Sequence, residues 1–325
     1  MRPTLYISCL LPNPVMAIAR ERFHLVQEPL NTLPCPAALR EGLCQADAAI
    51  VTLGDRIDTE TIHAATRLKI LANYAVGYNN IDLAAAQQRG LIVTNTPDVL
   101  TDTTADLTWA LLLATARRIV EGDTLVRSGT WTGWSPTQLL GADVSGKVLG
   151  IIGMGRIGQA VAQRSMGFRM TVLYHQRQPL AAATCSQTWQ YRSLHALLEE
   201  SDIVTIHVPL TPDTRHLLGA RELGLMKPTA FLINTARGPI VDEGAMVEAL
   251  THDMIAGAGL DVYEEEPAPH PLLTRLQQVV LLPHIGSATL QARINMGRIC
   301  LDNIQAVLGG RPAPNQIHEY GGCGT

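Results

Sequence analysis

The segment KVLGIIGMGRIGQAVAQRSMGF carries three glycines at the spacing of a phosphate-binding loop. Gly153, Gly155 and Gly158 form the pattern G-x-G-x-x-G, which is weak by itself because glycine is common. Such glycines permit a tight turn and close approach of the backbone to a pyrophosphate, which the free N–H groups at a helix start then bind. The first candidate chemistry is dinucleotide binding by residues Gly153, Met154, Gly155, Arg156, Ile157 and Gly158.

The residues on either side of this loop distinguish a binding loop from an ordinary turn. Val148–Ile152 form a short apolar run, as in a strand buried on both faces. After the loop, helical spacing is followed by Ile157, Ala160, Val161 and Arg164, and Gly167 predicts the end of that helix. A strand, a tight turn and a helix are the setting that the pattern requires. We therefore favour a dinucleotide site over a strand–turn–helix unit without a ligand.

Short apolar runs alternate with helical patterns along most of the chain. Strands are predicted at Thr4–Ser8, Ala48–Leu53, Leu68–Ala75, Leu91–Thr94, Val148–Ile152, Met170–Tyr174, Ile203–Val208, Ala230–Asn234, Ala258–Val262 and Val279–Leu282. The helices predicted between and after them include Thr101–Ser128, Ser193–Glu200, Glu243–Leu250 and Ala288–Leu308. This alternation indicates an α/β fold with two doubly wound parallel-sheet domains.

Length and composition bound the class of protein. At 325 residues the chain is long enough for two domains, and its 46% of hydrophobic residues include no uninterrupted run of membrane-spanning length. The start, MRPTLYISCLLPNPVM, is interrupted by prolines and lacks a signal-peptide core. The net charge is −4 and no basic tract is present. We expect a cytoplasmic protein that binds neither membranes nor nucleic acid.

The cysteines do not predict a metal site. None of the six forms a C-x-x-C pair, and no cysteine–histidine cluster has zinc spacing. We expect most of them to be reduced, buried, small hydrophobic residues, whereas Cys323 in the tail GGCGT is expected to be exposed.

Several longer segments stand in a fixed order along the chain. They are NYAVGYNNID and TPDVLTDTTADLTWALLLATAR before the glycine loop, and HVPLTPDTRHLL, LINTARGPIVDE, GAGLDVYEEEP and LLPHIGSAT after it. Together they resemble the D-isomer-specific 2-hydroxyacid dehydrogenases, and within that family most of all the glyoxylate and hydroxypyruvate reductases. The likeness runs from about residue 45 to about residue 310. It implies a Rossmann dinucleotide-binding domain at 100–287, inserted in a substrate domain formed by 1–99 and by a return helix and tail at 288–325.

The resemblance assigns catalysis to Arg237, Glu266 and His284. Reducing a 2-oxo acid needs a cation for its carboxylate, a proton donor for its carbonyl oxygen and a hydride source. Arg237 follows a predicted strand, and its planar guanidinium suits bidentate carboxylate binding. His284 can change protonation near neutral pH, and a hydrogen-bonded Glu266 would favour the imidazolium form and fix the ring. Each residue alone is compatible with a structural or solvated role, but together with the nucleotide loop they favour a catalytic triad.

The same resemblance implies the remaining site residues. The N–H groups of Val76 and Gly77 would hold the substrate carboxylate opposite Arg237. Asn79 stands where the family often has aspartate, a difference that we expect to alter only local hydrogen bonding. Asp261 resembles the acid that receives the nicotinamide carboxamide. The rest of the cofactor groove is predicted at Thr104, Pro209, Thr235, Ala236, Ile285, Gly286 and Ser287.

The strand after the glycine loop bears on which nicotinamide cofactor is used. It ends in TVLYHQRQ, with Gln176, Arg177 and Gln178 where an NAD-preferring site usually has an acid. That acid would accept hydrogen bonds from the ribose 2′-OH and repel a 2′-phosphate, whereas a guanidinium can bind the phosphate. We predict that NADPH is preferred, with NADH as a second candidate. The alternative is that Arg177 is a solvated surface residue.

The segment WTGWSPTQLLG contains two of the four tryptophans. In the resembling reductases an aromatic residue of this region reaches into the partner subunit's active site. Trp134 would take that place here, which predicts a homodimer. The alternative is a hydrophobic clamp on the chain's own fold.

The leading functional hypothesis is NAD(P)H-dependent reduction of glyoxylate and hydroxypyruvate to glycolate and D-glycerate. Members of the same superfamily act on 2-ketogluconate, larger 2-oxo acids or phosphite, and pocket shape, which the sequence does not reveal, decides among them. Formate dehydrogenases fit worse because Glu266 is present. A nicotinamide-sensing regulatory protein is the alternative from another class, and the complete triad favours turnover over sensing. A methyltransferase with the same glycine loop would leave the triad unexplained.

Overall fold

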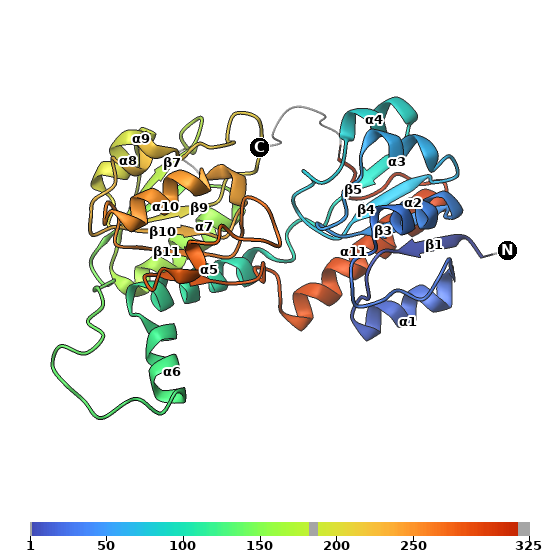
Figure 1. Ribbon diagram of the computed structural model, residues 1–325. Coiled ribbons are helices and arrows are strands. Elements are labelled where there is room, and N and C mark those ends of the chain that lie inside the picture. Colours follow the sequence, from blue (N-terminus) through green and yellow to red (C-terminus); the bar gives the residue numbers. More distant parts are fainter. Residues whose placement is uncertain (1, 182–187, 318–325) are drawn as a thin grey trace. The chain divides into compact units, whose positions relative to one another are not determined.

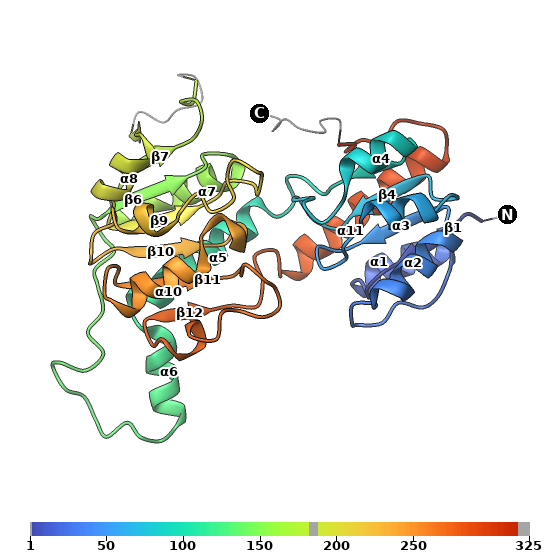
Figure 2. The same cartoon turned by 45° about the horizontal axis from the view of Figure 1, so that its top comes forward.

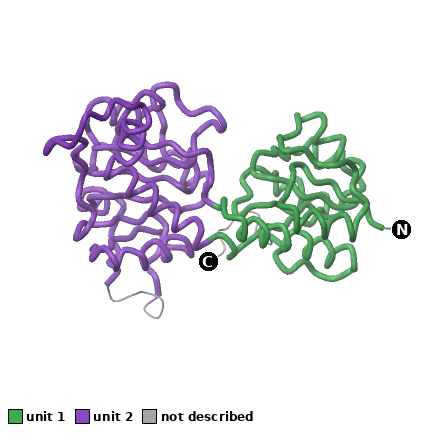
Figure 3. The backbone as a smooth tube through the Cα atoms, turned by 90° about the horizontal axis from the view of Figure 1, so that it is seen from below, with its two compact units in different colours: residues 1–100, 287–325 green, residues 101–286 purple. Residues whose placement is uncertain are grey.

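The computed structural model describes residues 2–181 and 188–317 (Figure 1). The chain divides into two compact units, one of residues 1–100 and 287–325 and the other of residues 101–286 (Figure 3). We call them unit 1 and unit 2. Each contains a parallel sheet with helices on both faces, which confirms the predicted fold class.

Unit 1 is built on a five-stranded sheet with the order β2-β1-β3-β4-β5. Its central strands are buried on both faces, which is why they are continuous apolar runs rather than alternating ones. The two-residue β2 was not predicted, because a half-exposed His–Leu pair carries no strand pattern. The strands are β1 (Thr4–Ile7), β2 (His24–Leu25), β3 (Ala48–Val51), β4 (Ile70–Asn73) and β5 (Ile92–Thr94).

Helices from both ends of the chain cover one face of this sheet. α1 (Asn13–Arg22) packs against α11 (Leu290–Leu308), which also contacts β3 and β4. The two helices approach so closely that a Cβ added at Gly297 would lie 2.6 Å from the Val15 side chain. On the other face, α2 (Pro36–Gln45), α3 (Thr59–Ala64) and α4 (Leu83–Arg89) follow one another along the sheet.

Unit 2 is built on a seven-stranded sheet with the order β12-β11-β10-β9-β6-β7-β8 (Figure 2). From β6 the chain winds outward through β7 to β8, and from β9 it winds the opposite way. The direction of winding thus reverses between β6 and β9, which is the position at whose carboxyl ends open α/β sheets bind ligands. The strands are β6 (Val148–Ile152), β7 (Thr171–His175), β8 (Trp189–Tyr191), β9 (Ile203–Ile206), β10 (Phe231–Asn234), β11 (Gly257–Leu260) and β12 (Val279–Leu281).

Helices cover both faces of the second sheet as well. α5 (Thr101–Ala116) packs on β10, β11 and α7 (Arg156–Arg164). Gly259 permits this approach, since an added Cβ would lie 2.7 Å from Thr115 Oγ1. α8 (Leu194–Glu200) contacts β6 and β7, and α9 (Ala220–Leu223) contacts both α8 and α10 (Glu243–Thr251).

The single helix predicted over Thr101–Ser128 is wrong. α5 ends at Ala116, Arg118 adopts a left-handed conformation with φ of 51°, and α6 spans Ile119–Arg127. α5 buries eight residues, whereas α6 buries none, so packing against the core ends where the chain turns. Arg118 is held in the turn by an ion pair with Glu121.

The end of the helix after the glycine loop also differs from the prediction. α7 stops at Arg164 and continues as a 3₁₀ turn over Ser165–Phe168, and the left-handed residue is Arg169 with φ of 54° rather than Gly167. Phe168 stacks on Trp109 of α5 with ring centroids 4.6 Å apart. Because Phe168 packs on α5, the helical turn continues beyond Gly167, where the sequence predicted the end of the helix.

The described cysteines are free thiols, but most are not buried. Cys300 is buried, Cys9 and Cys44 are partly exposed, and Cys35 is exposed. Cys185 and Cys323 lie outside the described residues. The prediction of mostly buried cysteines is therefore wrong for the described part, since three of its four lie in loops or on helix faces near the surface.

No helix among the described residues is long and apolar enough to cross a membrane.

Candidate active site

The three glycines of the loop after β6 serve three different purposes. Gly153 has φ of +99°, and an added Cβ would lie 2.6 Å from the backbone carbon of His207. Gly158 lies in α7, where an added Cβ would come 2.1 Å from the carbonyl oxygen of Gly153. At Gly155 an added Cβ would meet no atom within 4 Å. The outer two glycines thus serve the fold, and the middle one leaves open space in front of the backbone.

This open space lies at the start of α7. Gly155 is the N-cap of α7, so the first N–H groups of the helix have no partner within it. Gly153 packs against the backbone after β9, which places the loop between the two diverging halves of the sheet. A helix start, a backbone without side-chain cover and a reversal of the strand order at one place fit a dinucleotide pyrophosphate. Residues Gly153 to Gly158 would hold it.

The other predicted cofactor residues of unit 2 follow strands of the same sheet at the same edge. Pro209 follows β9, and Thr235 and Ala236 follow β10. Thr235 is buried and shares a 2.9 Å hydrogen bond with Thr108 of α5. Ser287 belongs to unit 1, beyond the boundary at residue 286.

Asp261, directly after β11, is wholly buried and organises the loop after β12. Its two carboxylate oxygens accept the N–H groups of Ile285 and Gly286, each at 2.7 Å. Thr104 of α5 donates its hydroxyl to the carbonyl oxygen of Gly286 at 3.1 Å. Burial raises the pKa of Asp261, and the two N–H donors oppose that rise. These contacts fix the two residues that follow His284.

His284 and Glu266 form a close pair. His284 Nδ1 lies 2.8 Å from Glu266 Oε2, and the histidine side chain is 27% exposed. His284 has φ of 54°, an uncommon conformation for a residue with a side chain. Because the carboxylate occupies Nδ1, Nε2 is the nitrogen left to face a substrate.

The protonation of Glu266 reflects this pairing. Burial raises the pKa of the Glu266 carboxyl, but the hydrogen bond and the charge of His284 outweigh burial and hold the pKa below its usual value. Glu266 Oε1 also accepts the Tyr263 N–H at 3.3 Å. The carboxylate is therefore ionised at neutral pH, and its negative charge lies beside the His284 ring.

Arg237 follows β10 and turns its side chain inward. Its Nη1 donates to the carbonyl oxygen of Ala236 at 2.6 Å. Burial lowers the pKa of the guanidinium, and the charge of Glu266 opposes that change. Gly238, the next residue, lies so close to the segment before Glu266 that an added Cβ would come 1.8 Å from the backbone carbonyl of Tyr263. Unit 2 thus brings the three predicted triad residues together at the carboxyl edge of its sheet.

Sequence reasoning missed two glutamates that shape this site, Glu243 and Glu264. Glu243 is 7% exposed at the start of α10, and each of the two carboxylates accepts the other residue's N–H group. In the segment VDEG, Glu243 looks like an ordinary acid in the first turn of a helix. Nothing in the one-dimensional pattern shows that its carboxylate reaches another loop.

Val76 and Gly77 lie in unit 1, in the loop after β4. Asn95 Nδ2 donates to the carbonyl oxygen of Val76 at 2.9 Å, and Asn73 Nδ2 donates to that of Gly77 at 2.8 Å. Within the described residues, neither N–H group has an acceptor. The loop is therefore anchored through its carbonyl groups while two adjacent N–H groups remain available to an anion.

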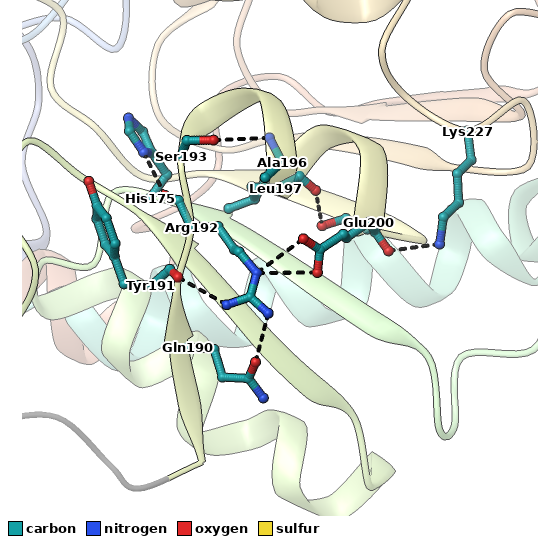
Figure 4. A network of polar contacts seen from close by, with 10 residues as sticks. His175, Gln190, Tyr191, Arg192, Ser193, Ala196, Leu197, Glu200 and Lys227 are labelled. Atoms are coloured by element: carbon teal, nitrogen blue, oxygen red, sulfur yellow. Dashed lines mark hydrogen bonds and ion pairs between the residues drawn. The ribbon is translucent and has the colours of Figure 1, made fainter.

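The end of β7 carries an exposed cation. Arg177 is exposed, and its guanidinium forms no hydrogen bond or ion pair with another described residue. Gln176 is bonded to the carbonyl oxygen of Gln178 at 2.7 Å. Nearby, the His175 ring binds the carbonyl oxygen of Arg192 at 3.0 Å (Figure 4).

Arg192 itself, by contrast, is fully engaged. Its Nε donates to both carboxylate oxygens of Glu200 at 3.1 and 3.2 Å, and its Nη2 donates to Gln190 at 2.9 Å (Figure 4). Lys227 adds a bond to the carbonyl oxygen of Glu200 at 2.7 Å. Of these two arginines near the end of β7, Arg177 is thus the one whose guanidinium is not bonded to another described residue.

Trp134 does not pack on its own unit. Its side chain is 82% exposed and lies in the long segment that follows α6, which extends away from the rest of unit 2 (Figures 1 and 2). Trp131, in the same segment, is 51% exposed. The alternative of a hydrophobic clamp on the chain's own fold is therefore wrong for Trp134.

Comparison with known families identifies most of unit 2. The model of the D-isomer specific 2-hydroxyacid dehydrogenase NAD binding domain matches residues 109–286. Among curated proteins, the glyoxylate reductase of Thermococcus gammatolerans is 47% identical over 323 residues, covering 98% of this chain and 97% of that protein.

Solved structures agree over the full chain. A protein from Thermus thermophilus is 45% identical with a TM-score of 0.90, covering 97% of this chain and 99% of that one. An NADPH-dependent glyoxylate/hydroxypyruvate reductase from Sinorhizobium meliloti, solved with NADP and malonate, is 33% identical with a TM-score of 0.87. The match covers 98% of this chain and 97% of that structure.

The open space at Gly155 generates a prediction. Gly155→Ala should weaken NADPH binding by about tenfold or more, equivalent to about 1.4 kcal/mol, because the new methyl group occupies the space for the pyrophosphate. The fold should not change, since φ of −74° suits alanine and the Cβ meets no protein atom. Fluorescence titration measures the affinity and thermal unfolding the stability. Gly167→Ala, also in open space, is the control, and equal affinity in both variants would contradict the assignment.

Proposed function

Since the chain belongs to the D-isomer specific 2-hydroxyacid dehydrogenase family and is an NAD(P)-dependent dehydrogenase, we propose that it reduces glyoxylate to glycolate and hydroxypyruvate to D-glycerate. The observation that carries the proposal is the Glu266–His284 pair beside Arg237 at the carboxyl edge of the sheet that bears the glycine loop. The curated relatives named glyoxylate reductase support the choice of acid.

The chemistry of the pair suits proton donation to a carbonyl oxygen. His284 Nε2 donates the proton, while Nδ1 stays bonded to Glu266, which stabilises the charged ring before transfer. When bound, the reduced nicotinamide supplies the hydride to the carbonyl carbon. Arg237 binds the substrate carboxylate, and its partial burial strengthens that ion pair. Val76 and Gly77 offer two free N–H groups for the same carboxylate.

We propose NADPH as the preferred cofactor. Gln176 and Gln178 place no negative charge at the end of β7, and Arg177 has no partner of its own there among the described residues. A 2′-phosphate would form an ion pair with this guanidinium. None of the three residues is an acid that would repel the phosphate. The similar Sinorhizobium meliloti enzyme is NADPH-dependent.

We propose that the enzyme is a homodimer and that Trp134 enters the partner's active site. α6 buries none of its residues, and the segment after it exposes further apolar side chains. An apolar surface of this kind marks an interface, and a two-fold axis would bury the same surface on both copies. The exposed apolar residues are Ile119, Val120, Val126, Trp131, Trp134 and Leu140.

The proton donor is tested by His284→Ala. We expect glyoxylate reduction to fall by roughly two to four orders of magnitude, the usual contribution of a general acid–base, with NADPH binding retained. Steady-state rates and fluorescence titration measure the two effects. Nearly normal turnover would refute the role of His284.

The carboxylate is tested by Glu266→Gln. Because the pKa of Glu266 is lowered, the wild-type carboxylate is ionised throughout the neutral range, and its removal acts on the alkaline limb of the rate profile. That limb should move to lower pH, since the neutral amide no longer supports imidazolium and the proton donor is exhausted sooner. A limb that stays in place would exclude this role for Glu266.

Cofactor preference is tested by Arg177→Ala. NADPH binding should weaken by about 1.5–3 kcal/mol, the scale of a charged hydrogen bond, while NADH, which lacks the phosphate, serves as the internal control. Gln176→Asp should shift preference toward NADH by adding repulsion. If the unmodified enzyme uses NADH as efficiently as NADPH, the proposed preference is wrong.

Assembly is tested by Trp134→Ala. We expect impaired use of small substrates by a folded protein, whereas Trp131→Ala should retain more activity because its indole is bonded to Gln138 of the same segment. Sedimentation should show a dimer for the wild type. A fully active monomer would disprove the proposal.

A further inference from the structure

One buried carboxylate holds both ends of the loop that carries Glu266. Glu243 Oε2 accepts the N–H group of Glu264 at 2.8 Å, and Oε1 accepts the N–H group of His270. Glu266 lies between these two anchor points. Since a different oxygen serves each end, the loop is fixed only while both oxygens of Glu243 accept hydrogen bonds.

A second glutamate completes the arrangement from the other side. Glu264 Oε2 accepts the N–H group of Glu243 at 3.3 Å, so the two residues exchange hydrogen bonds. Glu264 Oε1 receives His216 Nε2 at 2.6 Å and Arg215 at 3.3 Å. The Glu264 carboxylate is therefore bonded to two side chains, one of them the Arg215 guanidinium, whereas Glu243 relies on backbone donors.

The same contacts tie the Glu266 loop to the Arg237 segment. Gly238 lies so close to the loop that an added Cβ would come 1.8 Å from the backbone carbonyl of Tyr263. The ring of His216 binds Glu264, and the backbone N–H of His216 donates to the carbonyl oxygen of Pro239 at 2.8 Å. The backbone beside Arg237 and the loop of Glu266 thus share one hydrogen-bonded frame.

Glu243 is not the residue that caps the N-terminus of α10. The cap of α10 is Asp242, whose carboxylate accepts the Ala245 N–H at 2.9 Å. Glu243 is 7% exposed and forms no ion pair with any other described residue. A buried carboxylate without a cation is costly, although backbone donors and the helix N-terminus reduce that cost. Its two hydrogen bonds to separate points of one loop point to a geometric role.

We propose that Glu243 is a positioning residue for the Glu266–His284 pair. By holding residues 264 and 270, it sets where the Glu266 carboxylate stands relative to His284 Nδ1 and to the Tyr263 N–H group. The proposal rests on the proposed function, because the positioned pair is the one assigned to proton donation.

The test is Glu243→Gln, compared with the wild type. Glutamine offers one acceptor oxygen, so one end of the loop loses its anchor. We expect kcat for glyoxylate to fall roughly 10- to 100-fold, the effect of losing an orienting partner, with NADPH affinity and KM within about twofold. The alkaline limb should move to lower pH, in the same direction as in Glu266→Gln.

A double-mutant cycle separates positioning from a general structural effect. If Glu243 acts through Glu266, the Glu243→Gln/Glu266→Gln double variant should be no slower than Glu266→Gln. Multiplying losses would overturn the proposal. Glu248→Gln, on an exposed part of the same helix, is the matched control and should behave as wild type.

Two further outcomes are decisive. If Glu243→Gln does not fold, His216→Gln loosens Glu264 from its exposed side and should move the alkaline limb the same way by a smaller amount. The inference is refuted if a folded Glu243→Gln protein has the kcat and the pH profile of the wild type. If His216→Gln is the variant used, the same result in that folded protein refutes it. If His284→Ala also remained active, the proposed function itself would fall, so the two failures are distinguishable.

Discussion

The 2.8 Å contact between Glu266 Oε2 and His284 Nδ1 is the interaction on which the chemistry of this site depends. It leaves the ring's second nitrogen for the proposed substrate and keeps the Glu266 carboxyl ionised. Hydrogen bonds on both sides of the contact hold the two residues in place. Asp261 pins the backbone after His284, which holds a residue with φ of 54° in a conformation costing about 1 kcal/mol or more. Glu243 and Glu264 hold the opposite loop, so hydrogen bonds fix the backbone on both sides of the contact.

The sheet of unit 2 explains why this pair and the glycine loop stand at one edge. Parallel strands end together, so the loops after β6, β9, β10, β11 and β12 meet along a single line. Gly153 and Gly158 let strand, loop and helix pack closely, and Gly155 leaves the backbone bare. The proposed cofactor site and the proposed proton donor after β12 thus follow from one topology. Within unit 1, two asparagines hold the loop after β4 through the carbonyl groups of Val76 and Gly77.

Much of this could be predicted from the sequence, and the failures have physical reasons. Strands such as β3 and β4 are buried on both faces and therefore appear as apolar runs, whereas β2 lacks such a run. The break at Arg118 escaped prediction because it reflects the loss of packing partners, not a helix-breaking residue. Glu266 and His284 were found through motif resemblance. Glu243 could not be, because its contacts to Glu264 and His270 exist only once α10 and the loop are folded together.

The most direct measurement is turnover of hydroxypyruvate with NADPH, followed by loss of the reduced-nicotinamide absorbance and by chiral analysis of the product. The account predicts one D-glycerate formed for each NADPH oxidised, since one face of the carbonyl receives hydride while His284 supplies the proton. Binding of NADPH without turnover of hydroxypyruvate or glyoxylate would contradict it and would point to a nicotinamide-sensing protein instead.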